Sequence, residues 1–314
     1  MYDRRYVYAI AAGTFTVLMW ASLPLLRAHT GLPAMLTAAV AMSAAAGVAG
    51  VLAASRGEAG SAFKRGTYIG AGPVYWIGGV GGLIGALYFY FSALPLGDPA
   101  RITLVTYIWP VGFIVLVNRI QGRPVELHVI FGAAVAFAGV APLIISDTGA
   151  VGTPLIAYAA GVAAGGSWIV FSLYLRYAGS IPFRGYARLF SHAAVGAALL
   201  HVSSGGSFSG ASPLEWLVAG VIGLGPYGVA FMSWGFALRN GPSGLLGVLN
   251  YFVPVLSASL LVLFGHSQPE PQLATATLAV VAGSMIASHE RRLRSRPLSS
   301  GISRVRRLSR YGAH

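Results

Sequence analysis

The feature that most constrains this chain is a succession of apolar stretches, each long enough to cross a lipid bilayer as a helix. A hydrocarbon core about 30 Å thick needs roughly 20 apolar residues. Ten such stretches lie at about 6–26, 33–54, 68–93, 99–118, 126–146, 152–177, 186–204, 214–237, 243–264 and 269–289. Because lipid offers the backbone no hydrogen-bonding partner, each stretch is predicted to be helical. We therefore expect an all-α integral membrane protein with ten transmembrane helices.

The composition excludes a soluble fold. Only 9% of the 314 residues are charged, whereas a soluble domain uses about a quarter to keep its surface hydrated. The first apolar stretch is longer than the roughly 7–15 apolar residues of a signal peptide, so we interpret it as the first span. The chain contains no cysteine, which excludes disulfides and thiolate metal sites. No metal or cofactor is expected.

Basic residues are distributed unevenly between the two sides of the predicted membrane. The net charge of +13 would suit a nucleic-acid-binding protein, but the arginines lie in gaps between apolar stretches and in a tail over 291–314. With the N-terminus inside, only Arg27 and Arg101 of the 21 basic residues fall in outside loops. The positive-inside rule thus predicts cytoplasmic termini in the inner (plasma) membrane. The tail is expected to be disordered and close to anionic lipid, with no nucleic-acid partner.

An internal repeat appears when the chain is shifted by 144 positions. The shift aligns Leu94 with Leu238, Gly97 with Gly241, Tyr107 with Tyr251, Pro110 with Pro254, Glu126 with Glu270, and Ala138–Gly139 with Ala282–Gly283. The unit holds an odd number of helices, so its second copy is inverted: residues 1–147 form one five-helix repeat and 148–290 the other. Such repeats place a binding site between the halves, near the midplane. Chance similarity of two apolar sequences is the alternative.

Carboxylates are expected only near the membrane surfaces. All eight Asp and Glu residues fall in predicted loops, at span ends or near a terminus. A buried acid usually marks a proton or cation relay, so this distribution argues against antiport driven by a buried carboxylate and against acid–base hydrolysis within the bilayer. His192 lies well inside a predicted span. It is either a packed histidine or a proton carrier.

Aromatic and amide side chains within the spans are the candidate binding residues. Trp20, Trp109 and Trp168 fall near the middle of spans, where each indole N–H needs a polar partner. Together with nearby tyrosines they predict a cavity that stacks flat rings and holds an ammonium group, although such rings also fill gaps between helices. The candidate set is Trp20, Tyr88, Tyr90, Tyr107, Trp109, Trp168, Asn250 and Tyr251.

Prolines and glycines mark positions where helices are expected to bend or to touch. Pro110 and Pro254 occupy equivalent mid-span positions and remove a backbone hydrogen bond, so with Gly97 and Gly241 they are candidate hinges. The alternative is an ordinary tolerated membrane proline. The run 78–85 contains two Gly-xxx-Gly spacings, which predict close helix packing rather than a phosphate-binding loop.

Two junctions carry a family resemblance. Residues 93–98 leading into 105–110, and residues 237–242 leading into 249–254, resemble equivalent junctions of the EamA-type exporters in the drug/metabolite transporter superfamily. Residues 20–24 are similar to that family's first-helix signature, and Tyr107-Ile108-Trp109-Pro110 looks like its aromatic amino-acid-exporting branch. The resemblance implies efflux of aromatic amino acids, with Trp20, Tyr107, Trp109 and Trp168 facing the cavity.

We therefore expect a transporter, not an enzyme, that exports aromatic amino acids by alternating access without a buried-carboxylate proton relay. It is expected to act as a monomer surrounded by lipid. Three alternatives remain. The first is a proton-coupled drug or metabolite exporter of the same superfamily, relaying through His192. The second is an enzyme acting on lipid-linked substrates, which needs a polar cluster at one membrane face. The third is an assembly subunit, which needs no cavity.

Overall fold

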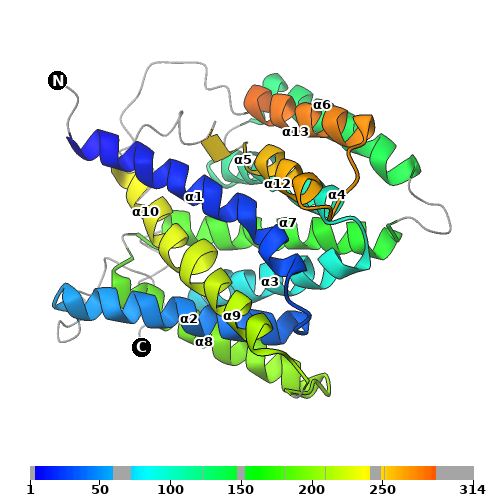
Figure 1. Cartoon of the computed structure of the whole chain (residues 1–314). Helices are drawn as coiled ribbons and strands as arrows, with labels where there is room; N and C mark the ends of the chain where they lie inside the picture. The colour runs from blue at the N-terminus through cyan, green and yellow to red at the C-terminus, as the bar shows by residue number, and fades with distance from the viewer. Residues whose placement is uncertain are drawn as a thin grey trace.

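The structure is a computed structural model, and it describes residues 4–58, 72–122, 124–146, 153–179, 181–208, 210–240, 249–250 and 252–287. These residues form ten helical segments that run roughly along a common direction (Figure 1). The segments are α1 (Arg4–Ala28), α2 (Ala34–Ser55), η2–α3–η3 (Val74–Gly81, Gly82–Ala93, Leu94–Leu96), α4–α5 (Pro99–Thr106, Trp109–Ile120), α6 (Leu127–Ser146), α7 (Leu155–Tyr177), α8 (Phe183–Ser203), α9–η4–α10 (Pro213–Ile222, Gly223–Val229, Ala230–Asn240), α12 (Phe252–Leu263) and α13 (Pro271–Ala287). The predicted all-helical fold is confirmed.

Six of the described segments are long and apolar enough to cross a bilayer: α1, α2, Val74–Leu96, Pro99–Ile120, α7 and Pro213–Ala237. Shorter apolar helices, at Leu127–Gly139, Phe252–Leu263 and Pro271–Gly283, lie within three more predicted spans. α8 is 21 residues long but carries Arg184, Arg188 and His192 in its first half, which lowers its hydropathy. Each predicted span therefore contains a helix, and six have the length and composition of a membrane crossing.

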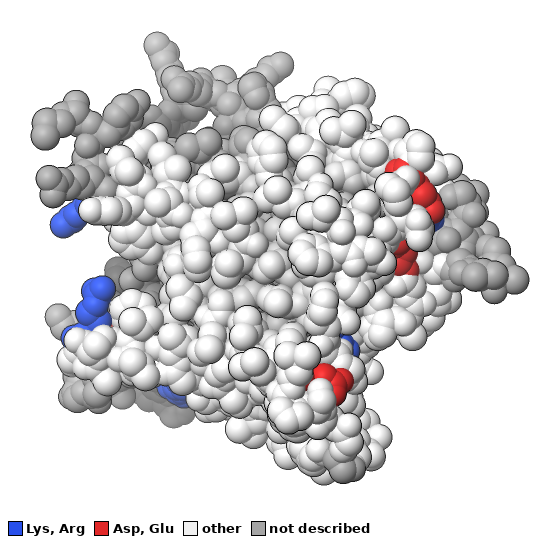
Figure 2. Space-filling view, in the orientation of Figure 1, with Lys and Arg blue, Asp and Glu red and all other residues white. Residues whose placement is uncertain are grey.

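The outside of the helix assembly is apolar. Leu127, Leu263 and Ile77 expose 83%, 77% and 69% of their surface. On the face seen in Figure 2, charged side chains lie toward the two ends of the helices, and a wide uncharged band separates them. A water-facing protein covers this much surface with charged groups. The band therefore suits lipid hydrocarbon.

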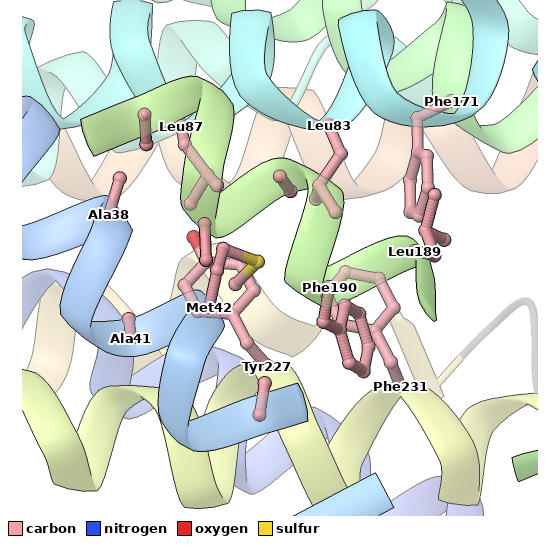
Figure 3. Packing of buried hydrophobic residues seen from close by; sticks show 14 of the residues in the cluster. Ala38, Ala41, Met42, Leu83, Leu87, Phe171, Leu189, Phe190, Tyr227 and Phe231 are labelled. Carbon is pink, nitrogen blue, oxygen red and sulfur yellow. The ribbon is translucent and has the colours of Figure 1, made fainter. Parts of the chain in front are cut away.

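Most helices pack against partners that are distant in sequence. α2 packs along α8, and α6 packs along α13. α1 contacts α10 and α12, while α7 contacts α3, α4 and α5. A large hydrophobic cluster fills the space between α2, α3, α7, α8 and η4–α10, where Phe190 and Phe231 meet with ring centroids 6.3 Å apart (Figure 3). A second cluster joins α4, α7, α12 and α13.

The glycine-rich run in the third segment packs tightly, as predicted, and its partner is α7. A Cβ atom placed on Gly82 would lie 2.9 Å from the backbone nitrogen of Phe171, and one on Gly79 would lie 3.1 Å from the Tyr174 ring. The start of the segment differs from a plain α-helix, because Val74–Gly81 is a π-helix. This stretch contains three glycines, which stabilise the α conformation poorly, and it packs against α7.

A second π-helix, η4, contains Pro226. Proline lacks the N–H that an α-helix needs at this position, and the wider turn accommodates the missing bond. In the same turn, the Trp20 indole Nε1–H donates to the Pro226 carbonyl at 3.0 Å. The expectation that this mid-span indole finds a polar partner is confirmed.

The fourth segment is broken in the middle. α4 ends at Thr106, and α5 begins at Trp109 with Pro110 in its first turn. Proline suits that place because the first N–H groups of a helix have no internal partner. A bend of one continuous helix was predicted at Pro110. The structure instead has two helices, with the interruption just before Pro110. At the equivalent position Pro254 is buried near the start of α12, whereas Gly241 and Tyr251 lie outside the described residues.

Candidate functional site

A cavity of about 70 Å³ lies inside the helix assembly. Its wall combines side chains from α1, α3, α4, α5, α7, η4 and α10, and from the turn between α4 and α5. The lining residues are Trp20, Leu23, Tyr90, Thr106, Tyr107, Trp109, Trp168, Phe171, Ser172, Leu175, Tyr227, Phe231 and Trp234. Segments from both predicted repeats therefore meet at one chamber.

The chamber brings together five of the eight candidate binding residues: Trp20, Tyr90, Tyr107, Trp109 and Trp168. Tyr88 lies outside it and is 44% exposed. Residues two apart on an α-helix point about 200° apart, so Tyr88 and Tyr90 cannot face the same space. Asn250 is 6% exposed and is not part of the cavity wall, and Tyr251 lies outside the described residues.

The cavity wall is a set of aromatic rings in mutual contact. Trp168 stacks on Phe231 with centroids 5.7 Å apart and planes at 27°. Trp20 lies between Phe231 and Trp234, at 5.6 and 5.4 Å. Tilted and stacked pairs at these distances hold one another in place. The wall therefore presents both ring faces and ring edges to the cavity.

Sequence reasoning missed several wall residues, although helical spacing points to them. Phe171 and Leu175 follow Trp168 by three and seven positions, and Leu23 follows Trp20 by three. Residues at these spacings share one helix face. Extending each tryptophan along its own face would have found these residues. Tyr227, Phe231 and Trp234 form a third stripe of this kind, on η4–α10.

Comparison of the chain with known proteins identifies the family to which it belongs. The chain is 34% identical over 286 residues to the aromatic amino acid exporter YddG of Ancylobacter novellus, and the match covers 89% of this chain and 96% of that protein. Residues 153–288 also match the EamA-like transporter family. The chain belongs to the EamA-like transporter family. A solved crystal structure with 32% identity superposes with a TM-score of 0.69, covering 91% of this chain and 99% of its own.

This EamA-like protein is therefore a multi-pass membrane transporter and not an enzyme, as the sequence resemblance indicated. Its described carboxylates all lie near helix ends, which confirms their predicted placement: Glu58, Asp98, Glu126, Glu215 and Glu270. Asp3, Asp147 and Glu290 lie outside the described residues. Two carboxylates cap helices, since Asp98 accepts from two N–H groups of α4 and Glu215 completes a capping box on α9.

Hydrogen-bonding groups in the transporter's cavity fall into two kinds. Some are already paired: the Tyr90 hydroxyl lies 2.8 Å from the Thr103 hydroxyl, and Thr106 donates to the carbonyls of Ile102 and Gly161. The Tyr227 hydroxyl is different, because it is buried and has no partner within the described ranges. A buried unpaired hydroxyl is costly. The Tyr227 side chain is also part of the cavity wall.

His192 lies apart from the cavity wall. Its Nδ1 atom is 2.6 Å from the Tyr75 hydroxyl, and its ring stacks on Trp76 with centroids 4.8 Å apart. These contacts join α8 to η2. No group of three potential metal ligands occurs among the described residues. His192 therefore takes part in a helix–helix contact, and it is not among the residues that line the chamber.

The cavity is small. Its volume of about 70 Å³ holds a few water molecules, whereas ligand pockets usually measure about 300–1,000 Å³. The neighbouring rings fill the remaining space. A solute much larger than a few water molecules does not fit within this volume.

Proposed function

We propose that this transporter exports aromatic amino acids, as a monomer in the inner membrane, by alternating access through the ring-walled cavity. The observation that carries the proposal is the meeting of Trp20, Trp109 and Trp168 around one acid-free chamber. Indole faces stack on flat rings and attract an ammonium group. The 34% identity to an aromatic amino acid exporter supports the same substrate class.

The proposed mechanism needs two inverted repeats, 1–147 and 148–290, and the helix contacts support them. In the order of the segments, α1, α3 and α4–α5 of the first half correspond to α7, α10 and α12 of the second. The contact between α3 and α7 therefore corresponds to the contact between α10 and α1, and that of α4–α5 with α7 corresponds to that of α12 with α1. The same correspondence leaves α2–α8 and α6–α13 unchanged. All of these pairs are in contact, as a pseudo-twofold axis requires.

Matched glycines give independent support to the repeat. Gly139 and Gly283 are aligned by the shift of 144 positions. A Cβ atom on Gly139 would collide with Ala279 of α13, and one on Gly283 would lie 2.7 Å from the Ala136 nitrogen of α6. Each glycine thus performs the same packing task at the same crossing, which chance similarity does not require.

The contacts also suggest which bodies move. α1 contacts α10 and α12, α7 contacts α3, α4 and α5, and the cavity lies between these two groups, which also meet where α4 contacts α12. Rocking one group against the other would open the chamber first on one side and then on the other. The proposed hinges are Gly97, Pro110, Gly241 and Pro254. At Gly97 a Cβ atom would collide with Thr153, so a side chain there would disturb the junction.

Both termini are proposed to be cytoplasmic, and the absence of cysteine from the chain makes this testable without background. Ser55 and Ser204 are exposed serines at the ends of α2 and α8. On the proposed topology Ser204→Cys reacts with an impermeant maleimide in intact cells, whereas Ser55→Cys reacts only after permeabilisation. The opposite labelling pattern would show that the topology is inverted. Labelling of both cysteines in intact cells would contradict the ten-helix topology altogether.

Substrate counterflow tests the proposed function directly. Proteoliposomes loaded with unlabelled phenylalanine are expected to accumulate external labelled phenylalanine transiently, and internal tryptophan or tyrosine should replace the unlabelled solute. Internal proline, which has no aromatic ring, should support counterflow poorly, since it cannot stack on the cavity wall. Absence of counterflow with every aromatic amino acid would reject the proposal.

The rival function is a proton-coupled exporter of drugs or other metabolites in the same superfamily. The hydrogen bond between His192 and Tyr75 favours it, because it joins two segments that could move against each other. An imposed pH gradient separates the two functions. Phenylalanine movement that ignores the gradient supports facilitated export, and concentrative movement lost in His192→Ala supports the rival.

A further inference from the structure

Arg27 is a buried cation near the end of α1. It is 7% exposed, and its terminal nitrogens donate to the carbonyls of Thr30 and Leu32. Its Nε atom has no partner, and it forms no ion pair in the part of the chain that the structure describes. Glu215, whose carboxylate reaches the same turn, is occupied by Gly31 and Ser212. A guanidinium buried without a counter-charge is costly.

The position of Arg27 continues the cavity-facing side of α1. Leu23 lines the cavity, and Arg27 follows it by four positions, so both lie on one helix face. The guanidinium carbon lies 5.7 Å from the centroid of the Phe91 ring. Phe91 in turn lies 6.2 Å from Tyr227, which is part of the cavity wall. Two aromatic rings, those of Phe91 and Tyr227, thus lie between the charge and the chamber along this path.

The repeat places Arg27 opposite a residue that already lines the cavity. On α7 the residues Trp168, Phe171 and Leu175 have the same spacing as Trp20, Leu23 and Arg27 on α1, at a local offset of 148 positions, four more than the offset of 144 that aligns the later helices of the two repeats. All three α7 residues line the cavity. The described conformation therefore extends the chamber to the Leu175 position of α7 but stops short of the equivalent position on α1.

We propose that Arg27 binds the carboxylate of the substrate when the transporter opens at the α1 end. This inference rests on the proposed function and on the inverted repeat, which makes the Arg27 position part of the wall in the opposite conformation. A guanidinium holds a carboxylate through two parallel N–H···O bonds, while the aromatic wall holds the ring. The equivalent residue on α7, Leu175, is uncharged. The α1 end and the α7 end of the transport path therefore differ in charge. On the proposed topology, the carboxylate meets Arg27 on the outer side.

The test compares two solutes that share a ring and an ammonium group. Phenylalanine has a carboxylate, and phenethylamine lacks it. In proteoliposomes, Arg27→Gln is expected to raise the KM for phenylalanine about tenfold or more, the effect of one charge-assisted hydrogen bond. The KM for phenethylamine should stay unchanged or fall. Arg176→Gln, in the last turn of α7 and exposed, is the matched control and should change neither KM.

Equal changes for the two solutes, or no change for either, would overturn the assignment. If Arg27→Gln elutes as an aggregate, Arg27→Lys replaces it, because lysine keeps the charge but not the two-pronged geometry. That variant is expected to raise the phenylalanine KM severalfold and to leave the amine unaffected, and an unchanged ratio would overturn the proposal. A wild-type protein that moves phenethylamine but not phenylalanine would reject the proposed substrate and the Arg27 assignment together.

Discussion

Replacing Gly223 by alanine is expected to destabilise the protein by about 3 kcal/mol, at the upper end of the usual cost of overpacking. Gly223 begins η4 and lies against α2. A Cβ atom there would collide with the Ala41 carbonyl oxygen and lie 2.7 Å from both its carbonyl carbon and its Cα. Backbone atoms cannot rotate away as a side chain can. α2 and η4 would have to move apart, although residues of both helices belong to the main hydrophobic cluster.

A matched control lies three residues earlier on the same segment. A Cβ atom on Gly220 would meet nothing within 4 Å, so Gly220→Ala should be neutral or stabilise by up to about 1 kcal/mol through helix propensity. Thermal unfolding of both variants in detergent, followed by intrinsic tryptophan fluorescence, measures the difference. Equal Tm values for Gly223→Ala and the wild type would show that α2 and η4 do not touch as described.

Trp109→Ala is expected to reduce phenylalanine counterflow at least about tenfold, because one ring face and its desolvated contact are lost from the cavity. The effect on folding should be small by comparison. Trp109 is half-buried and faces the chamber, and its ring meets Phe113 edge-on at a centroid distance of 6.2 Å. Trp109→Phe keeps an aromatic face and should retain much of the transport.

Trp76→Ala is the control for this prediction. Trp76 is 51% exposed and stacks on His192 away from the cavity, so its loss removes a tryptophan without opening the chamber. Initial rates are compared at equal amounts of folded protein, judged by size-exclusion elution. Full transport by Trp109→Ala would remove this residue from the binding set, and equal loss in Trp76→Ala would point to a general effect on the fold.

Much of the architecture was predictable because a bilayer acts as a uniform solvent. Helix positions depend on the summed hydropathy of about 20 residues, a quantity that requires no knowledge of neighbouring helices. The same solvent penalty places Asp98, Glu215 and Glu270 near helix ends. The close helix contact at Gly82 was also predictable from the sequence. Glycines four residues apart indicate that another helix packs closely there, whichever helix it is.

Other features depended on which helices meet. The sequence indicated that the run around Gly82 packs closely, but only the structure identified α7 as its partner. Tyr88 and Tyr90 are both mid-span tyrosines, yet rotation about the helix axis sends one outward and the other into the chamber. The two π-helices likewise follow from local packing and from Pro226, which hydropathy does not register.

The sequence by itself determined that this chain is a bundle of membrane helices with acids excluded from the interior and aromatic rings retained there. These properties follow from the free energy of transferring each residue from water to lipid, a sum over single positions. The tertiary structure decided that rings from several separate segments enclose one cavity, and that Arg27 is a buried cation beside it and not a loop charge. Both depend on contacts between residues far apart in the chain, which no sum over positions contains.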